Sequence, residues 1–195
     1  LVGFAAHPAA VVVCGRRRER FPEASVYNRL ADAEWNTPVG LAFACGGDAL
    51  MRFSAVQAVG GYRDDLIAGE EPELCLRLRA AGGEIWRIDA EMTWHDAAMQ
   101  RFGQWWQRSV RAGHAFAEGT ALHGAGHWGA EMRRAVIWGL ALPLMYPVQV
   151  LRLALRGGLV WAWFSVLGKF AEAQGVLGFW VSHLRGRKRG LIEYK

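Results

Sequence analysis

Cysteine is scarce in this chain of 195 residues: three copies, Cys14, Cys45 and Cys75, lie far apart and form no Cys-x-x-Cys pair. An odd, unpatterned set argues against both a disulfide framework and a zinc site. A secretory signal is missing too, because the opening LVGFAAHPAAVVVCG has neither a basic n-region nor an initiating Met. We therefore expect three buried thiols in a reducing compartment, in a sequence that begins within a domain of a longer protein.

Acidic residues are few in the last third of the chain. Residues 131–195 hold ten Lys and Arg against three Asp and Glu, a net charge of +7, whereas residues 1–130 hold thirteen against fifteen, a net charge of −2. Ten Trp residues add an aromatic character to the sequence. A basic, Trp-rich tail beside a near-neutral body indicates an anionic partner for the tail, either membrane lipid or nucleic acid.

Strand and helix patterns alternate over the first hundred residues, which predicts an α/β domain. Short apolar runs predict strands at Ala10–Cys14 and Glu84–Ile88. The stretch RRRERFPEAS after the first strand is predicted to be a polar loop. Periodicity and capping signals predict three helices, at Val26–Trp35, Ala55–Val59 and Pro72–Ala81. Ser54 is the expected N-cap of the second helix.

The stretch GEEPELCLRLRAAG (residues 69–82) places three carboxylates around a proline at the beginning of the third helix. Leu74 and Leu78 share an apolar face with Cys75, and we expect Glu73 to pair with Arg77 on the opposite, solvent face. Acidic side chains are favoured in a first helical turn, so capping alone is one explanation of all three carboxylates. The other explanation is that one of them removes a proton as a general base.

A different pattern begins with Arg101–Glu118, RFGQWWQRSVRAGHAFAE, which is helical in period and mixes aromatic and arginine side chains. The Gly/His-rich stretch His123–Gly129 follows it. Its three glycines disfavour a helix on which its two histidines would hold a metal, so we predict a mobile linker over residues 121–130. The expected division is an α/β domain at 1–120 and a hydrophobic, basic helical tail at 131–195.

Two apolar runs in the tail have the composition of membrane-associated helices. Ala135–Leu151 has seventeen uncharged residues between arginines, which is the lower limit for spanning a bilayer, and Gly157–Gly168 has twelve. Core helices of a soluble protein have the same hydrophobicity, but the flanking arginines and nearby Trp residues favour membrane association. Whether residues 135–151 span the membrane or lie on it stays open at this point.

Four short motifs occur in a fixed order along residues 10–118. They are Gly-Gly-Asp at 46–48, VGGY at 59–62, Glu70-Glu71 ahead of LCLRLRAAG, and QWWQRSVRAG at 104–113. In this order they resemble the C-terminal half of bacterial family 2 glycosyltransferases, whose usual forms are Gly-Gly-(Asn/Asp), Val-Gly-Gly-(Phe/Tyr) and Gly-Glu-Asp-x-(Asp/Glu)-Leu-x-x-Arg-Leu. The hydrophobic tail resembles that of membrane-associated members.

The resemblance implies a GT-A fold, whose first half binds the nucleotide and holds a divalent metal, Mg²⁺ or Mn²⁺, through an Asp-x-Asp motif. No Asp-x-Asp occurs in this sequence, and the nearest imitation, Asp89-Ala90-Glu91, lies in the wrong place. We therefore expect an α/β architecture that is the C-terminal portion of a GT-A fold, followed by hydrophobic helices. Most of the donor and metal site would belong to an N-terminal half that precedes this sequence.

The resemblance also implies roles for single residues. Glu71 stands where the family has its catalytic base, an Asp, which takes the proton of the acceptor hydroxyl in an inverting transfer. Glu70, Gly47 and Asp48 are the expected acceptor contacts, although Asp48 would also fit an ordinary Asx-turn. His95 stands in a region where some GT-A enzymes use a histidine as a metal ligand or diphosphate contact, whereas a lone His is more often structural.

Arg108, Arg111 and Trp105 belong to QWWQRSVRAG, which resembles an altered form of the Gln-x-x-Arg-Trp element of processive relatives. Arginines neutralise a leaving diphosphate, and a Trp face stacks on a sugar or base. The alternative is an amphipathic interface helix with snorkelling arginines. The departure from the motif argues against processive polymer synthesis.

The leading hypothesis is an inverting glycosyltransferase at the cytoplasmic face of the cell membrane. It would move a sugar from a nucleotide-sugar donor to a saccharide or lipid-linked acceptor and would contact membrane lipid. The alternative is a non-catalytic membrane-surface binding module whose acids only cap helices. Nucleic acid is not an expected partner, because the tail's charges flank apolar runs instead of forming a polar basic face.

Overall fold

The computed structural model describes residues 2–141 and 143–187. The chain divides into two compact units: a sheet unit, Leu1–Asp65 with Glu70–Gln100, and a helical unit, Leu66–Gly69 with Arg101–Lys195. The division therefore falls before the aromatic helix that was expected to complete the α/β domain, and the boundary expected at residue 120 lies inside the helical unit.

The sheet unit contains a four-stranded mixed sheet in the order β2-β4-β1-β3, which confirms an α/β fold. Strand β1 (Ala10–Glu19) pairs in parallel with β4 (Glu84–His95), and the antiparallel edge strands are β3 (Ala49–Met51) on β1 and β2 (Gly40–Leu41) on β4. Both central strands are longer than predicted. The stretch after Cys14 is strand and not loop, because its backbone pairs with the second half of β4.

The sheet unit also contains the three predicted helices, with small shifts at their ends, together with a short helix and a 3₁₀ turn that were not predicted. They are α1 (Val2–Ala6), a 3₁₀ turn η1 (Pro22–Ala24), α2 (Val26–Trp35), α3 (Phe53–Ala58) and α4 (Glu70–Ala80). Helix α2 matches its prediction at both ends, and Ser25 caps it by accepting the Asn28 N–H at 3.0 Å. Helix α3 begins one residue before Ser54, so Ser54 is not its N-cap.

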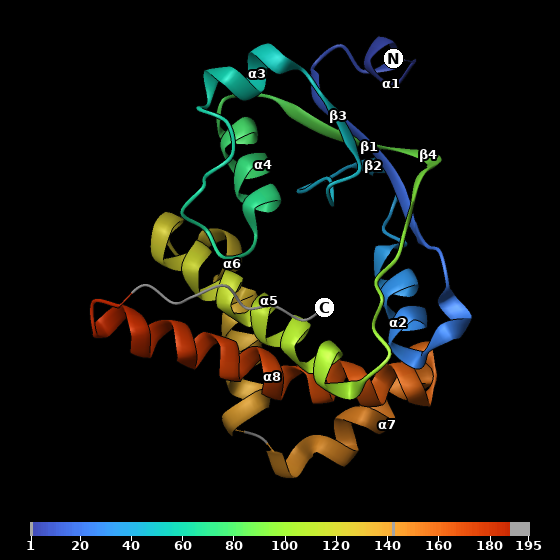
Figure 1. The fold of residues 1–195 in the computed structure, drawn as a ribbon, viewed down its shortest axis with the longest axis vertical. Coiled ribbons are helices and arrows are strands. Elements are labelled where there is room, and N and C mark those ends of the chain that lie inside the picture. The colour runs from blue at the N-terminus through green and yellow to red at the C-terminus, as the bar shows by residue number, and fades with distance from the viewer. Residues whose placement is uncertain (1, 142, 188–195) are drawn as a thin grey trace. The chain divides into compact units, whose positions relative to one another are not determined.

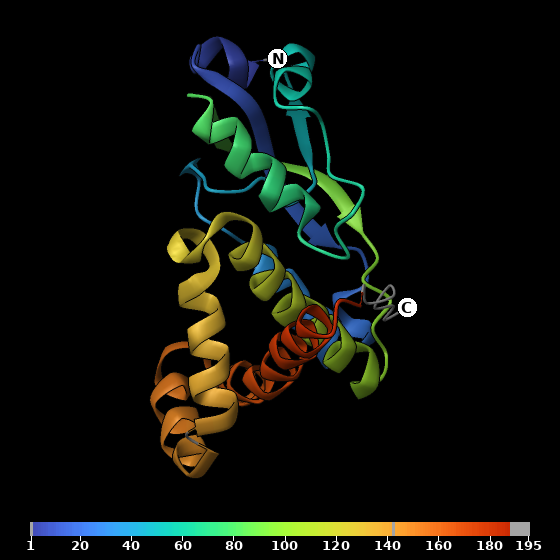
Figure 2. The same ribbon diagram turned by 90° about the vertical axis from the view of Figure 1, so that its left-hand side faces the viewer.

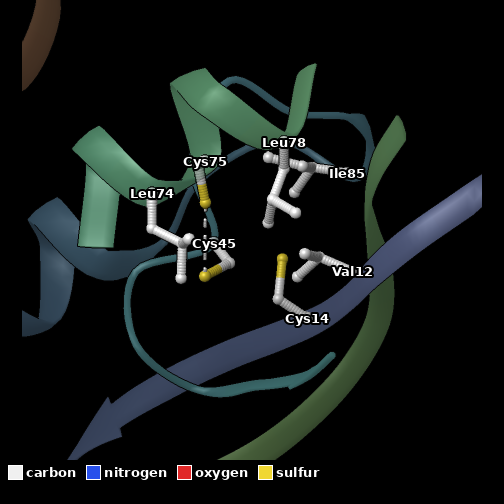
Figure 3. Packing of buried hydrophobic residues seen from close by; sticks show 7 residues of the cluster. All are labelled: Val12, Cys14, Cys45, Leu74, Cys75, Leu78 and Ile85. Carbon is white, nitrogen blue, oxygen red and sulfur yellow. Dashed lines mark hydrogen bonds between the residues drawn. The ribbon is translucent and has the colours of Figure 1, made fainter. Parts of the chain in front are cut away.

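The core of the sheet unit forms where α4 packs on one face of the sheet (Figures 1 and 2). Figure 3 shows its seven buried side chains: Val12, Cys14, Cys45, Leu74, Cys75, Leu78 and Ile85. All three thiols are buried and free, as the sequence predicted. Burying each large aliphatic side chain contributes about 1.5–3 kcal/mol.

The pair between Glu73 and Arg77 forms as predicted, but it does not lie on a solvent face. Arg77 Nε donates to Glu73 Oε1 at 2.9 Å, and the Glu73 side chain is 2 % exposed. Arg77 also donates to the carbonyl oxygens of Val59 and Gly61, the latter at 2.7 Å. The VGGY turn therefore covers this side of α4, which is why the expected solvent face is wrong.

The helical unit is built from α5 (Phe102–His123), α6 (Ala125–Val136), a π-helical turn η2 (Ile137–Ala141), a 3₁₀ turn η3 (Pro143–Met145), α7 (Tyr146–Gly157) and α8 (Leu159–Leu184). The linker predicted over 121–130 is wrong, because α6 begins directly after Gly124. Gly124 adopts φ 78°, which glycine reaches without strain, so a single residue turns the chain between two helices.

Helices α5 and α8 lie side by side and touch through glycines (Figures 1 and 2). A Cβ atom at Gly113 of α5 would overlap the carbonyl oxygen of Glu172, and one at Gly175 of α8 would overlap that of Val110. Only hydrogen atoms fit between these backbones. The contact between the two longest helices therefore depends on the absence of side chains at both positions.

The apolar run Ala135–Leu151 is divided among α6, η2, η3 and α7 and does not form one helix. In the described part of the chain no single helix is long and apolar enough to cross a membrane. The segments Ala125–Leu140 and Pro143–Gly157 reach that requirement only when taken together, and they are bent by 85°. Several large apolar side chains of α7 and of the beginning of α8 are exposed, namely Val148, Leu151, Leu155, Leu159 and Val160.

Candidate functional site

A cavity of about 240 Å³ in the sheet unit is lined by both carboxylates of the Gly-Gly-Asp and Glu-Glu motifs, Asp48 and Glu71. The two residues are far apart in the sequence: one follows the Gly46-Gly47 turn and the other lies in the first turn of α4. Further lining residues come from β1, the end of α2 and β4, among them Arg17, Trp35 and Arg87. The fold therefore brings the two carboxylates to one cavity.

The Glu71 carboxylate is held in place through one of its oxygens. Oε1 accepts the backbone N–H of Cys45 at 2.7 Å, and the thiol sulfurs of Cys45 and Cys75 lie 2.9 Å from it. Among the residues that the structure describes, no hydrogen bond reaches Oε2, so this oxygen is available to a group in the cavity.

The Cys75 thiol beside Glu71 remains protonated and acts as a donor. The hydrogen bond with Cys45 raises the pKa of Cys75 far above its ordinary value, and burial and the charge of Glu71 raise it further. Burial likewise raises the pKa of Cys14, in the same core, to about 11. Neutral S–H groups stabilise a neighbouring carboxylate without neutralising it.

Asp48 is positioned by Arg17. The guanidinium group of Arg17 pairs with the Asp48 carboxylate and also donates to the carbonyl oxygen of Gly46. The turn before Asp48 has φ 84° at Gly46 and 90° at Gly47, and a Cβ at Gly47 would lie 2.7 Å from Arg17 Nη2. Both glycines are therefore required, and Gly47 shapes the site through its backbone.

Two further residues give the cavity an aromatic wall and a fixed cation. Arg17 lies with its guanidinium carbon 5.2 Å from the centre of the Trp35 ring. Arg87, which is 9 % exposed, donates to the carbonyl oxygens of Gly15 at 3.3 Å and Ala44 at 3.1 Å. It thereby holds the loop that carries Cys45 against β1.

The sequence reasoning missed Arg17, Trp35 and Arg87. A signal existed for Arg87, because the alternation of EIWRI places it on the same face as the buried Ile85, where a charged residue needs partners. No signal marked Arg17, which stands in the stretch predicted as loop.

The remaining predicted residues lie in different surroundings. Glu70 begins α4 and is half-buried, and His95 ends β4 with its ring centre 5.3 Å from that of Trp35; neither is among the residues that line the cavity. Arg108 and Arg111 are half-buried on α5 of the helical unit. Trp105 is 6 % exposed and packs against Phe164, with ring centres 5.0 Å apart. A buried indole offers no face for stacking, so the stacking role expected of Trp105 is corrected.

In the part of the chain that the structure describes, no group of side chains fits the Mg²⁺ or Mn²⁺ that the resemblance implies. Such hard cations require oxygen ligands. Among the described residues, the group of three side chains close enough to share an ion is Cys45, Glu71 and Cys75, which offers two sulfurs and one oxygen. Asp48 is engaged by Arg17, and His95 lies against Trp35.

No protein-family model matches the chain, and no curated protein matches its sequence at a significant level. The interpretation of the site therefore depends on its geometry and on the order of its motifs.

Proposed function

We propose that the sheet unit is the acceptor-side half of a GT-A glycosyltransferase domain and that Glu71 is the general base of an inverting sugar transfer. The observation that carries the proposal is that Glu71 and Asp48, from two separate motifs, line one cavity together with Trp35. Carboxylates that accept from hydroxyl groups, beside an aromatic wall, suit a sugar. Arg17 and Arg87 keep the carboxylate side of the cavity fixed.

The reaction balances with one base and one leaving group. The acceptor hydroxyl gives its proton to the Glu71 carboxylate while its oxygen forms a bond to the anomeric carbon of the donor sugar. The bond from that carbon to the phosphate oxygen breaks on the opposite face, and the nucleoside diphosphate leaves with the electron pair. A single displacement of this kind inverts the configuration at the anomeric carbon.

The surroundings of Glu71 match this role because they fix the base without occupying it. Three donors hold Oε1, and the carboxylate borders the cavity. A base held in one orientation needs no rearrangement before proton transfer, and such positioning is a large part of catalysis. The Asp-to-Glu difference from the family's usual motif is compensated in this proposal by the anchoring of Oε1.

The test uses the full-length protein with a panel of nucleotide-sugars and a membrane lipid extract as acceptor. Release of nucleoside diphosphate is measured for wild type, Glu71→Gln and Glu23→Gln. Loss of the base costs about 10²–10⁴-fold in turnover, while Glu23, an exposed residue of the same unit, is the matched control. Donor binding should be unchanged in Glu71→Gln, because the base acts on the acceptor. Equal turnover in wild type and Glu71→Gln would refute the assignment.

The exposed apolar side chains of α7 support the proposal that the helical unit contacts lipid at the cytoplasmic face of the membrane. Leu151 is 67 % and Leu155 85 % exposed, and Arg152 and Arg156 stand next to them in the sequence. This combination suits an interface between acyl chains and anionic headgroups.

Sedimentation with vesicles tests the lipid contact and separates the two candidate functions. Leu151→Ser with Leu155→Ser should weaken binding to anionic vesicles, whereas Leu122→Ser, an exposed leucine of α5, should not. Vesicle binding together with full turnover in Glu71→Gln would favour the alternative, a non-catalytic membrane-surface module.

A further inference from the structure

The thiols of Cys45 and Cys75 point toward each other between α4 and the loop before the Gly46-Gly47 turn (Figure 3). Their sulfurs are 3.7 Å apart, and each lies 2.9 Å from Glu71 Oε1. Both cysteines are buried, whereas Glu71 borders the cavity. Two soft donors and one hard donor thus converge at a point that is closed toward the core and open toward the cavity.

We propose that Cys45, Cys75 and Glu71 form a binding site for a borderline-soft divalent cation of the Zn²⁺ type. The metal would be held by two thiolates and one carboxylate oxygen, with a fourth position open to the cavity. This site shares Glu71 with the sugar transfer proposed above but does not depend on that proposal, because metal binding requires only the three side chains.

The spacing of the sulfurs matches a tetrahedral zinc ion. Zn–S bonds of about 2.3 Å place two sulfurs about 3.8 Å apart in a tetrahedron, and the observed separation is 3.7 Å. The same geometry needs about 3.5 Å between each sulfur and the oxygen, compared with the observed 2.9 Å. Only Oε1 must therefore move, by about half an ångström, and Glu71 is the half-buried member that borders free space.

Local structure prepares the ligands in advance. Glu71 and Cys75 are four residues apart on α4, so the helix places them on one face. Cys45 is fixed from the other side, since its backbone N–H donates to Glu71 and its carbonyl oxygen accepts from Arg87 at 3.5 Å. The charges also balance: two thiolates and a carboxylate carry −3, and the zinc ion with the Arg87 guanidinium carries +3.

Metal binding at this site releases protons. The two S–H groups, which donate to Glu71 in the metal-free protein, release two protons to solvent as the ion enters, and two Zn–S bonds and one Zn–O bond form. Soft thiolates select zinc over Mg²⁺ and Mn²⁺, so this is not the hard-metal site that the family resemblance implies. The missing Cys-x-x-Cys pair argued against zinc because that motif reports only on neighbouring cysteines. Here the fold brings together two cysteines that are distant in the sequence.

The experiment titrates the intact chain with Co²⁺ and then Zn²⁺ under a non-thiol reductant, without donor or acceptor. The expected result is one Co²⁺ per chain with a thiolate-to-cobalt charge-transfer band and tetrahedral d–d bands, which Zn²⁺ abolishes. Native mass spectrometry should show the mass of one zinc ion less two protons. Because no sugar is present in this titration, a failure to bind metal would not count against the proposed sugar transfer. A failure of the turnover assay would likewise not count against the metal site.

Variants identify the ligands. Cys75→Ser and Cys45→Ser should each lower zinc affinity by at least about 100-fold. Loss of a residue that only supports a metal ligand already costs up to about 100-fold, and loss of a ligand itself should cost no less. Glu71→Gln should keep the charge-transfer band but lower the affinity for zinc. Cys14→Ser, which alters a third buried thiol of the same core, should bind as wild type. No thiolate band in the reduced wild type, or equal bands in wild type and Cys75→Ser, would overturn the site.

Discussion

Glu73 and Glu71 are two residues apart on α4, and we expect replacing them to have different consequences, because Glu71→Gln removes the proposed base whereas Glu73 belongs to a buried ion pair. Glu73→Gln should destabilise the sheet unit. The Glu73 carboxylate is 2 % exposed and accepts from Arg77 at 2.6 to 3.0 Å, through both of its oxygens. Breaking a buried pair costs about 3–5 kcal/mol, because the remaining charge loses its partner. Arg77 is 22 % exposed and keeps two carbonyl acceptors, so we expect about 2–4 kcal/mol.

Hydrogen exchange, followed by mass spectrometry on peptides of α4 and of the Val59–Gly61 turn, measures this loss within one unit. That choice matters because a chain of two units need not unfold in one step. The expected loss corresponds to about 30- to 700-fold faster exchange of the protected amides. Glu23→Gln, which breaks an exposed pair in the same unit, is the control and should change nothing measurable. Exchange in Glu73→Gln as slow as in wild type would show that the buried pair does not hold the turn.

Two further predictions concern stability elsewhere. Gly113→Ala or Gly175→Ala should each lower the stability of the helical unit by at least about 1–3 kcal/mol, because the new methyl group meets backbone of the facing helix. The control Gly126→Ala has open space around it and should raise the melting temperature slightly. Equal melting temperatures for all three variants would contradict the close packing. Partial burial alone would raise the pKa of Asp32, but the Glu19 amide and neighbouring arginines lower it below the ordinary 3.8. Asp32 therefore stabilises the fold at neutral pH, and the melting difference between wild type and Asp32→Asn should shrink as the pH falls below 3.8.

Elements with local signals could be predicted from the sequence. Helix α2 has both ends where expected, because a serine cap and a change in periodicity mark them. Helix α4 ends before Gly82, whose φ of 87° ends the helix as its sequence indicated. The length of β1 could not be predicted, since its polar half is strand only through pairing with β4, far along the chain.

The same distinction applies to the site. Glu71 and Asp48 could be found because each belongs to a motif of neighbouring residues. The pair of Arg17 with Asp48, and the approach of Cys45 to Cys75, depend on contacts between distant segments and carry no mark in the sequence. Burial of Glu73 likewise depends on a turn that folds over α4, so helical periodicity alone placed it on the wrong face.

Both proposals involve the Glu71 carboxylate, as a general base in one and as a zinc ligand in the other. Oε1 faces the thiols of Cys45 and Cys75, and Oε2 has no protein partner among the described residues. A zinc ion on Oε1 withdraws electron density from the whole carboxylate and lowers its basicity, so the group cannot serve fully as ligand and base at once. In the metal-free protein the same oxygen accepts hydrogen bonds from the two thiols and the Cys45 amide, and no metal competes with a proton for the carboxylate. Occupation of the thiol site by zinc would therefore oppose sugar transfer, and assays of Glu71 as a base belong in the presence of a zinc chelator.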